Sequence, residues 1–581
     1  MAGGQDISNY FANKYETLYN SVSYNDDDMD ILKKKIDAMI VDFDIESDDV
    51  CDIHVSVNDV VNGMNHVKRN KKDGLGLLYT DHFINASQMF YILLSLMFST
   101  IICHGFTPDG FNIASIQPLI KDKRKSVNDS SNYRAIALSS PLAKIFDCII
   151  LNKNFHKFRT NDLQFGFKPN SSTTKCTFAL EETINYFQQN NSDVYVLLLD
   201  ATKAFDKVNY IKLFQLLIDR GINPYIIKCL LYMYTNQHLN VSWNGCMSKY
   251  FSTTNGVKQG GVLSPILFAV YVDELLIRLK NSGYGCMIGH IYCGALGYAD
   301  DIALIAPSTH ALKQMCAICL EYASEYDLEF NPSKSQLIKY GDKEDRPFYF
   351  DGAHINYTEK GVHLGHTIGP NIHKHKVKDM ILDFKWRVNC VMDNFHFCNT
   401  ETRYGLFKAY CTSFYGICLW NLQDSSVSSF FTSWRIAMRK VLCLPYRTHC
   451  NLLPLIAGCA PVEVQILNRI VKFICSGIKS DNTVLKVLST LALNGSMSNV
   501  SKSCTYIMAK YGLSSSAFHV YSNSLFHQLF QNVYREDLSE DLLANASLIR
   551  DVLGSRETVS SGSLLDLGEL NFLLYSLCVG N

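Results

Sequence analysis

The periodicity of apolar and polar positions changes along the chain. This change divides the chain into a region of predicted strands and helices and a region of predicted helices. From about residue 55 to about residue 357, apolar stretches of strand length alternate with amphipathic stretches of helical period and with turns rich in Gly, Pro and Asn. This mixture is typical of an α+β enzyme. Beyond about residue 374 the strand signals fade, and helices are predicted at residues 379–394, 401–419 and 462–478.

The first 50 residues contain little that indicates chemistry, and we predict an irregular, peripheral acidic lead-in with one short helix at residues 29–39. Residues 89–103 are strongly apolar, but the run is shorter than the roughly 18 to 20 residues that cross a bilayer, so a buried helix is predicted. The polar start of the chain lacks the pattern of an export signal. We therefore expect an intracellular protein with no membrane association, in the nucleus or the cytoplasm.

Composition and charge limit the possible domain organisation, partners and cysteine chemistry only in part. A chain of 581 residues that is 47% hydrophobic is expected to fold as two to four subdomains. Its formal net charge of −1 argues mildly against a nucleic-acid partner, although basic runs occur at residues 68–72 and 121–125. These runs fit solvated surfaces equally well. The 20 cysteines are scattered, which favours free, mostly buried thiols over disulfides.

Two acidic motifs follow or interrupt apolar segments. Residues 194–199 form an apolar run of strand length that ends at Asp200, and Asp300 and Asp301 lie between apolar residues 295–298 and 302–306, as in a tight strand–turn–strand. Taken separately, Asp200 could cap the following helix and the acid pair could belong to an ordinary β-turn. Taken together, the three carboxylates could hold two Mg²⁺ ions, which prefer hard oxygen ligands and catalyse phosphoryl transfer.

Around these acids the sequence resembles the reverse-transcriptase family, most closely the polymerases of non-LTR, LINE-like retrotransposons of the jockey type. The resemblance runs from about residue 73 to residue 369 and follows the family's order of motifs. The motifs are PLIK at 118–121, NYRAIAL at 132–138, QFGF at 164–167, DATKAFD at 200–206, NGVKQGGVLSP at 255–265, YADD at 298–301, NPSK at 331–334 and HLG at 363–365.

The resemblance implies a role for each matching residue. Asp200, Asp300 and Asp301, with the backbone carbonyl of Ala201, would be the metal ligands. The other implied contacts are Lys121 and Arg134 with the incoming triphosphate, Gln259 and Gly260 beneath the nucleotide, Phe205 as a gate against the 2′-hydroxyl, Lys334 beside the leaving pyrophosphate, and Leu364 with Gly365 as a primer grip. Phe205 could instead be a core aromatic, and Lys334 a solvated loop residue.

The implied fold is a right-hand polymerase of the α+β class. Its expected parts are an acidic lead-in at 1–54, fingers and palm at 55–370, a helical thumb-like region at 371–480 and a helical C-terminal extension at 481–581. The implied activity is that of an RNA-directed DNA polymerase of a mobile element, using two Mg²⁺ ions (or Mn²⁺), deoxynucleoside triphosphates, an RNA template and a DNA primer or RNA–DNA hybrid. We expect no room for the endonuclease that jockey-type elements carry ahead of the polymerase.

Two alternatives stay open. One is an RNA-dependent RNA polymerase in which Asp206 would read a ribose hydroxyl, and the other is a polymerase-derived protein that binds nucleic acid without turnover. Three further features are interpreted as structural. Cys316 and Cys319 are expected on a core-facing side of a helix, and the histidines at 363, 366, 373 and 375 are not expected to bind metal. A group of aromatic residues in the C-terminal region is expected to pack in a core, although it could also grip a nucleic-acid duplex. Those aromatics are Tyr404, Phe407, Tyr410, Phe414, Tyr415 and Trp420.

Overall fold

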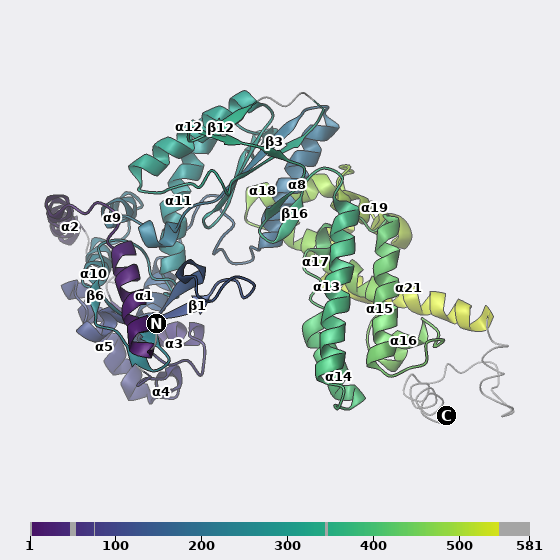
Figure 1. The fold of residues 1–581 in the computed structure, drawn as a ribbon, viewed down its shortest axis with the longest axis horizontal. Helices are drawn as coiled ribbons and strands as arrows, with labels where there is room; N and C mark the ends of the chain where they lie inside the picture. Colours follow the sequence, from purple (N-terminus) through teal and green to yellow (C-terminus); the bar gives the residue numbers. More distant parts are fainter. Residues whose placement is uncertain (1–2, 47–53, 75, 343–346, 545–581) are drawn as a thin grey trace.

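The chain folds into an α+β body with a helical C-terminal part, as the sequence predicts. The computed structural model describes residues 3–46, 54–74, 76–342 and 347–544. Figure 1 shows the N-terminal elements on one side, the strands that carry the acidic motifs at the top, and helices α13 to α21 on the other side. This layout agrees with the right-hand arrangement of fingers, palm and thumb.

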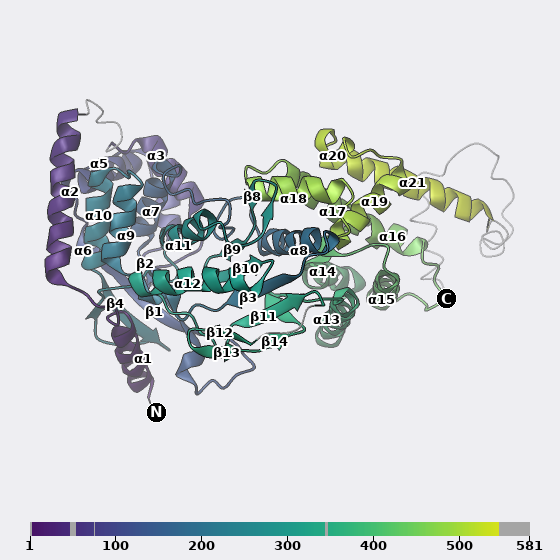
Figure 2. The same cartoon turned by 90° about the horizontal axis from the view of Figure 1, so that it is seen from above.

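The palm is a five-stranded sheet with the strand order β14-β11-β3-β10-β9. Its central strand consists only of buried apolar residues, which is why the run before Asp200 forms a strand inside the protein. Helices α8, α11 and α12 pack against the sheet, and Figure 2 shows α8 and α12 beside it. The bounds are β3 (Val194–Leu199), β9 (Ala295–Tyr298), β10 (Asp301–Ala306), β11 (Gln336–Tyr340), β14 (Tyr357–Thr358), α8 (Thr173–Gln189), α11 (Ser264–Asn281) and α12 (Thr309–Glu325). The predicted strand and hairpin are confirmed.

The fingers contain a second sheet, in which β1 pairs antiparallel with β2 and parallel with β4. Its strands are β1 (Ile113–Ile120), β2 (Tyr133–Ser139), β4 (His238–Trp243), β5 (Cys246–Met247) and β6 (Phe251–Ser252). Helices surround it: α3 (Val57–His66), α4 (Thr80–Ile84), α5 (Gln88–His104), α6 (Asp109–Asn112), α7 (Pro141–Lys153), α9 (Tyr210–Asp219) and α10 (Pro224–Thr235).

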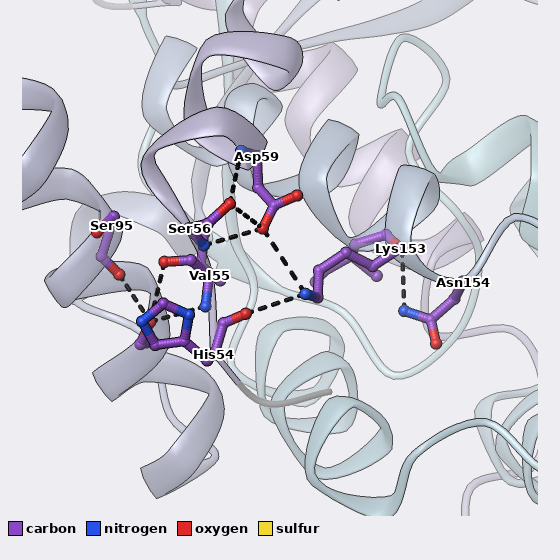
Figure 3. Close-up of polar contacts among 9 residues, drawn as sticks. His54, Val55, Ser56, Asp59, Ser95, Lys153 and Asn154 are labelled. Carbon is purple, nitrogen blue, oxygen red and sulfur yellow. Dashed lines mark hydrogen bonds and ion pairs between the residues drawn. The ribbon is translucent and has the colours of Figure 1, made fainter. Parts of the chain in front are cut away.

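Helix α3 shows how local sequence and packing cooperate in the fingers. The Ser56 side chain accepts from the backbone N–H of Asp59, and the Asp59 carboxylate accepts from the Ser56 backbone N–H, which is a capping box. Figure 3 shows that the side chain of Lys153, at the end of α7, points toward the Asp59 carboxylate and the His54 carbonyl. Its ammonium donates to the carbonyl of His54 at 2.9 Å and lies 3.7 Å from the Asp59 carboxylate, so α3 is fixed to α7.

The N-terminal segment corrects the prediction of an irregular, peripheral lead-in. It forms α1 (Gly4–Leu18), which packs on the fingers sheet, and α2 (Asp26–Glu46), which contains the helix predicted at residues 29–39. Phe11, Tyr15 and Tyr19 follow one another at intervals of four residues, and all three are buried against that sheet. Residues four apart lie on one helix face, so this aromatic stripe docks α1.

The C-terminal part is helical as far as residue 544, with a break near residue 412 that the sequence did not predict, and the rest of the predicted helical extension lies outside the described residues. Its helices are α13 (His373–Asn394), α14 (Thr400–Cys411), α15 (Ser425–Val441), α16 (Leu452–Ile456), α17 (Val462–Ile478), α18 (Thr483–Leu493), α19 (Asn499–Tyr511), α20 (Ala517–Val520) and α21 (Asn523–Ala544). The helix expected to run to residue 419 ends at Cys411, and the segment after it does not continue the helix, since Phe414 (φ 45°) and Gly416 (φ 76°) take left-handed conformations.

Several smaller expectations have clear outcomes. The run at 89–103 lies in helix α5, but it is only partly buried, since Met89, Leu93 and Leu96 are exposed. No described helix is long and apolar enough to cross a membrane. The cysteines within the described ranges are all free. Cys316 and Cys319 are buried on α12, as expected of a core face.

The tail aromatics divide between the core and the surface. Phe407, Phe414 and Trp420 are buried, whereas Tyr410 and Tyr415 are exposed. The packed-core interpretation therefore holds for these three buried residues and in part for the half-buried Tyr404, but not for Tyr410 and Tyr415.

Candidate active site

The palm sheet brings the three predicted carboxylates together in register. Leu199 of β3 pairs with Ile302 of β10, so the next position places Asp200 opposite Asp301. Asp301 also pairs with Tyr298 of β9, which leaves Ala299 and Asp300 as the two-residue turn. Ala299 has φ 61°, a conformation that costs energy for a residue with a Cβ, so the turn is held in place by its surroundings.

The acid pair has unusual electrostatics. Burial, followed by the nearby Asp200 carboxylate, raises the pKa of Asp300. Burial and the charges of Asp300 and Asp200 raise the pKa of Asp301 to about 6. Mutually repelling, partly buried carboxylates are stabilised by a cation, so this end of the sheet is suited to bind positive charge.

Lys334 lies beside the first carboxylate. Its ammonium is 3.4 Å from Oδ2 of Asp200, and the loop that carries it is tied to β3 by the Asn331 N–H, which donates to the Asp200 carbonyl at 2.8 Å. The neighbouring Ala201 pairs with Phe330. Asp200 thus faces the Lys334 ammonium, and no three His, Cys, Asp or Glu side chains among the described residues are gathered closely enough to form a ready-made metal site.

Two cations of the fingers act on the acid pair. Lys121 and Arg134 both lower the pKa of Asp300, against the upward shift caused by burial. Arg134 lies in β2 and Lys121 directly follows β1, the strand paired with it: Leu119 pairs with Arg134, and the Lys121 N–H donates to the carbonyl of Asn132 at 2.7 Å. Both side chains are exposed, so they are free to contact an anion at this site.

The loop before α11 connects the fingers to the palm. The carbonyl of Gln259 accepts from the Ala137 N–H of β2 at 2.7 Å. Gly260 has φ 109°, and a Cβ there would lie 2.7 Å from the Ala137 carbonyl oxygen, so glycine is required at this position. Asp147 of α7 accepts hydrogen bonds from the backbone N–H groups of Val262 and Leu263, an anchor for the loop that the sequence did not reveal.

The predicted sugar gate has aromatic neighbours. The Phe205 ring stacks on Phe268 of α11, with ring centroids 4.2 Å apart and an interplanar angle of 19°. Phe167 meets it edge-on at 6.1 Å. Phe205 is half-buried, so one part of the ring is packed and another part is open to solvent. The packed part of the ring fits the core-aromatic alternative, and the role of Phe205 as a gate against the 2′-hydroxyl stays a prediction.

Leu364 and Gly365 form the turn of a hairpin made by β15 (Gly361–His363) and β16 (His366–Ile368). The turn has φ 51° at Leu364 and 78° at Gly365. Tyr415 fixes it from the thumb side: its hydroxyl donates to the Leu364 carbonyl at 2.7 Å, and its ring stacks on His366 at 4.4 Å. The sequence placed Tyr415 among possible core or duplex contacts and not at this hairpin.

The two histidines of this hairpin are packing residues. Burial lowers the pKa of both His363 and His366 to about 4, and each lies near a threonine of α8. They are neutral at pH 7 and join the hairpin to the palm helix.

Comparison with known proteins agrees with the motifs. Residues 120–378 match the family model described as "Reverse transcriptase (RNA-dependent DNA polymerase)". The chain is 25% identical over 243 residues to the Pol polyprotein of the type-2 retrotransposable element R2DM of Drosophila melanogaster, covering 42% of this chain and 23% of the relative. It is 25% identical over 343 residues to the RNA-directed DNA polymerase from mobile element jockey of Drosophila funebris, covering 57% of this chain and 35% of the relative.

A solved structure shows a weaker likeness. Apo telomerase from Candida tropicalis aligns with 73% of this chain and 68% of that chain at 13% identity, with a TM-score of 0.36. The matched segments span 23% to 35% of the two retrotransposon relatives, so those relatives are much longer than the shared region.

Proposed function

We propose that the chain, whose residues 120–378 match the reverse transcriptase family, is an RNA-directed DNA polymerase of a non-LTR mobile element. It adds deoxynucleotides to a primer 3′-hydroxyl on an RNA template. The observation that carries the proposal is the pairing of β3 with β10, which sets Asp200 opposite Asp301 with Asp300 in the adjoining turn.

The three carboxylates fit a pair of Mg²⁺ ions. Their oxygens are hard donors, and burial, with the mutual repulsion of the neighbouring carboxylates, raises the pKa values of Asp300 and Asp301, so a bound cation would stabilise their charged forms. Asp200, Asp300 and Asp301, with the carbonyl of Ala201, would hold the ions. Bound there, the ions would activate the primer hydroxyl and neutralise the triphosphate. Mn²⁺ has the same ligand preferences and could substitute.

The protein's own groups position the reactants. The Lys121 ammonium and the Arg134 guanidinium bind the triphosphate, as a point charge and a bidentate fork suit phosphate oxygens. The primer 3′-hydroxyl gives its proton to water, its oxygen forms a bond to the α-phosphorus, and the bond from that phosphorus to the pyrophosphate oxygen breaks. Lys334 leaves its contact with Asp200 and gives a proton to the departing pyrophosphate.

The sugar is selected by Phe205. Its ring is backed by Phe268, so it resists displacement by a ribose 2′-hydroxyl, and deoxynucleotides are preferred. Asp206 is a poor candidate for reading a ribose, because it is buried and hydrogen-bonded to Tyr19 and Gln259. This arrangement disfavours the RNA polymerase alternative.

Primer extension on RNA with Mg²⁺ tests the proposal. Wild-type protein is expected to extend a DNA primer with deoxynucleotides, and Asp300→Asn to lose at least about a thousandfold in rate, because a ligand of the catalytic ions is weakened. Asp351→Asn, in the turn between β12 (Phe348–Phe350) and β13 (Ala353–Ile355), is the matched control and should extend normally. If wild type and Asp300→Asn bind RNA but are equally inert, the chain is a binding protein and the proposal is wrong.

A further inference from the structure

The N-terminal helix α1 is an integral part of the fingers. Phe11 stacks on Trp243 of β4, with ring centroids 5.6 Å apart, and meets Tyr133 of β2 at 5.1 Å. The Gln5 amide donates to the carbonyl of Met247 at 2.9 Å. Because both the sheet and the helix bury aromatic surface at this contact, α1 is expected to move with the fingers as one unit.

The end of α1 is fastened to the loop that leads to Gln259. The carbonyl of Tyr19 accepts from the N–H groups of Thr254 and Asn255 at 3.0 and 3.1 Å. The Asn255 amide donates to the carbonyls of Leu18 and Asp206, at 3.2 and 2.7 Å. One short segment therefore holds the helix end and the residue after Phe205 together.

The Tyr19 side chain continues this connection into the nucleotide site. It is 3% exposed and lies against Gly256, where a Cβ would come within 2.8 Å of its ring. Its hydroxyl hydrogen-bonds to the Asp206 carboxylate, and the Gln259 amide donates to the same carboxylate at 3.2 Å. Asp206 directly follows Phe205 in the chain. A line of hydrogen bonds thus runs from α1 through Asp206 to Gln259, and Phe205 is joined to it as the chain neighbour of Asp206.

We propose that Tyr19 is a positioning residue of the nucleotide site, acting through Asp206 on Gln259 and Phe205. The inference rests on the proposed polymerase function. A buried carboxylate requires hydrogen-bond donors for its lone pairs. Tyr19, at the end of α1, and Gln259, in the loop before α11, both donate to the Asp206 carboxylate. With Tyr19 in place, Asp206 holds the Gln259 side chain in one orientation. Without it, the carboxylate and the amide are free to take other arrangements.

The hydroxyl can be tested by a pair of matched substitutions. Tyr19→Phe removes the hydrogen bond and keeps the ring. Tyr15→Phe, on the same helix and equally buried, removes a hydroxyl with no hydrogen-bond partner among the described residues. Single-nucleotide incorporation by the full chain on primed RNA should show a KM for deoxynucleotide raised roughly three- to thirtyfold in Tyr19→Phe, with a smaller change in kcat and weaker discrimination against ribonucleotides. Tyr15→Phe should match wild type.

A double-mutant cycle identifies the route. If Tyr19 acts through Gln259, Tyr19→Phe will have little further effect on KM in a Gln259→Ala background. Multiplying effects on KM together with unchanged discrimination against ribonucleotides in Tyr19→Phe would overturn the proposal, as would equal KM values in Tyr19→Phe and Tyr15→Phe. If wild type extends no primer and binds no deoxynucleotide on a dideoxy-terminated primer, the polymerase assignment itself fails and the positioning role falls with it.

Discussion

The side-chain oxygen of Gln164 accepts a hydrogen bond from the backbone N–H of Ala299 at 3.0 Å, although 135 residues separate them in the sequence. The same oxygen accepts from the Gly166 N–H at 2.8 Å, and Gln164 is completely buried. Gly166 packs so closely that a Cβ on it would lie 2.5 Å from the Ala299 nitrogen. The turn that carries Asp300 is therefore held by the 164–167 segment.

Replacing this acceptor should impair catalysis more than binding. Gln164→Met keeps a long side chain but leaves the buried N–H of Ala299 unpaired, at a cost of about 1–3 kcal/mol. We expect kcat for primer extension to fall roughly ten- to a hundredfold, with the Kd for primer–template nearly unchanged. Gln237→Met, at another buried glutamine, is the control for general destabilisation. Equal losses in both variants would argue against a role for Gln164 in the turn.

Phe205 should determine sugar selection. Phe205→Ala opens space beside the sugar, and we expect the preference for deoxynucleotides over ribonucleotides to fall by about ten- to a hundredfold, the scale set by a pocket that excludes one group. Phe268→Leu, which removes the stacking partner beneath the ring, should give a smaller change in the same direction. Competition between the two nucleotide types on one primed RNA measures the ratio. An unchanged ratio in Phe205→Ala would show that the ring is only a core residue.

The sequence predicted the features that depend on neighbouring residues and missed those that depend on distant ones. An apolar run followed by Asp200, and an acid pair between two short strands, are local patterns, and β3 and the β9–β10 hairpin form where they predict. The contact of Tyr415 with Leu364 joins residues 51 apart and left no local signal. Tyr19 is an intermediate case, since the aromatic spacing that docks α1 was present in the sequence, but its partner Asp206 was not indicated by it.

Tyr415 should stabilise the primer-grip hairpin. Tyr415→Phe keeps the stacking on His366 and removes the hydroxyl that bonds the Leu364 carbonyl and contacts Thr173 at 2.7 Å. Because Leu364 has a left-handed backbone, loss of this bond should loosen the turn. We expect the Kd for primer–template to rise about three- to tenfold, for a lost bond worth about 1 kcal/mol, with products becoming shorter. Tyr410→Phe, at an exposed tyrosine of α14, should leave both unchanged.

Glu182 should make stability depend on pH. This α8 carboxyl is buried against the turn between α18 and α19, where it accepts a hydrogen bond from the Ser496 hydroxyl at 3.1 Å. Burial raises its pKa to about 8, against the stabilising effect of hydrogen bonds from Ser498 and Ser496, and the neighbouring Glu181 adds to the rise. The buried thiol of Cys504 also lies near it.

The free energy of unfolding should depend on pH because Glu182 has different pKa values in the folded and unfolded chain. Between its ordinary pKa of 4.5 and about 8, Glu182 loses its proton when the chain unfolds and keeps it when the chain is folded, so its contribution to the free energy of unfolding decreases as pH rises. Glu182→Gln cannot ionise, so its stability relative to wild type should increase by up to about 1.4 kcal/mol per pH unit from pH 6 to pH 8. Denaturant unfolding at several pH values measures the difference. Glu321→Gln, at an exposed position on α12, is the control, and its free energy of unfolding should differ from that of wild type by the same amount at every pH. If the difference for Glu182→Gln is also the same at every pH, the Glu182 carboxyl is already ionised in the folded chain.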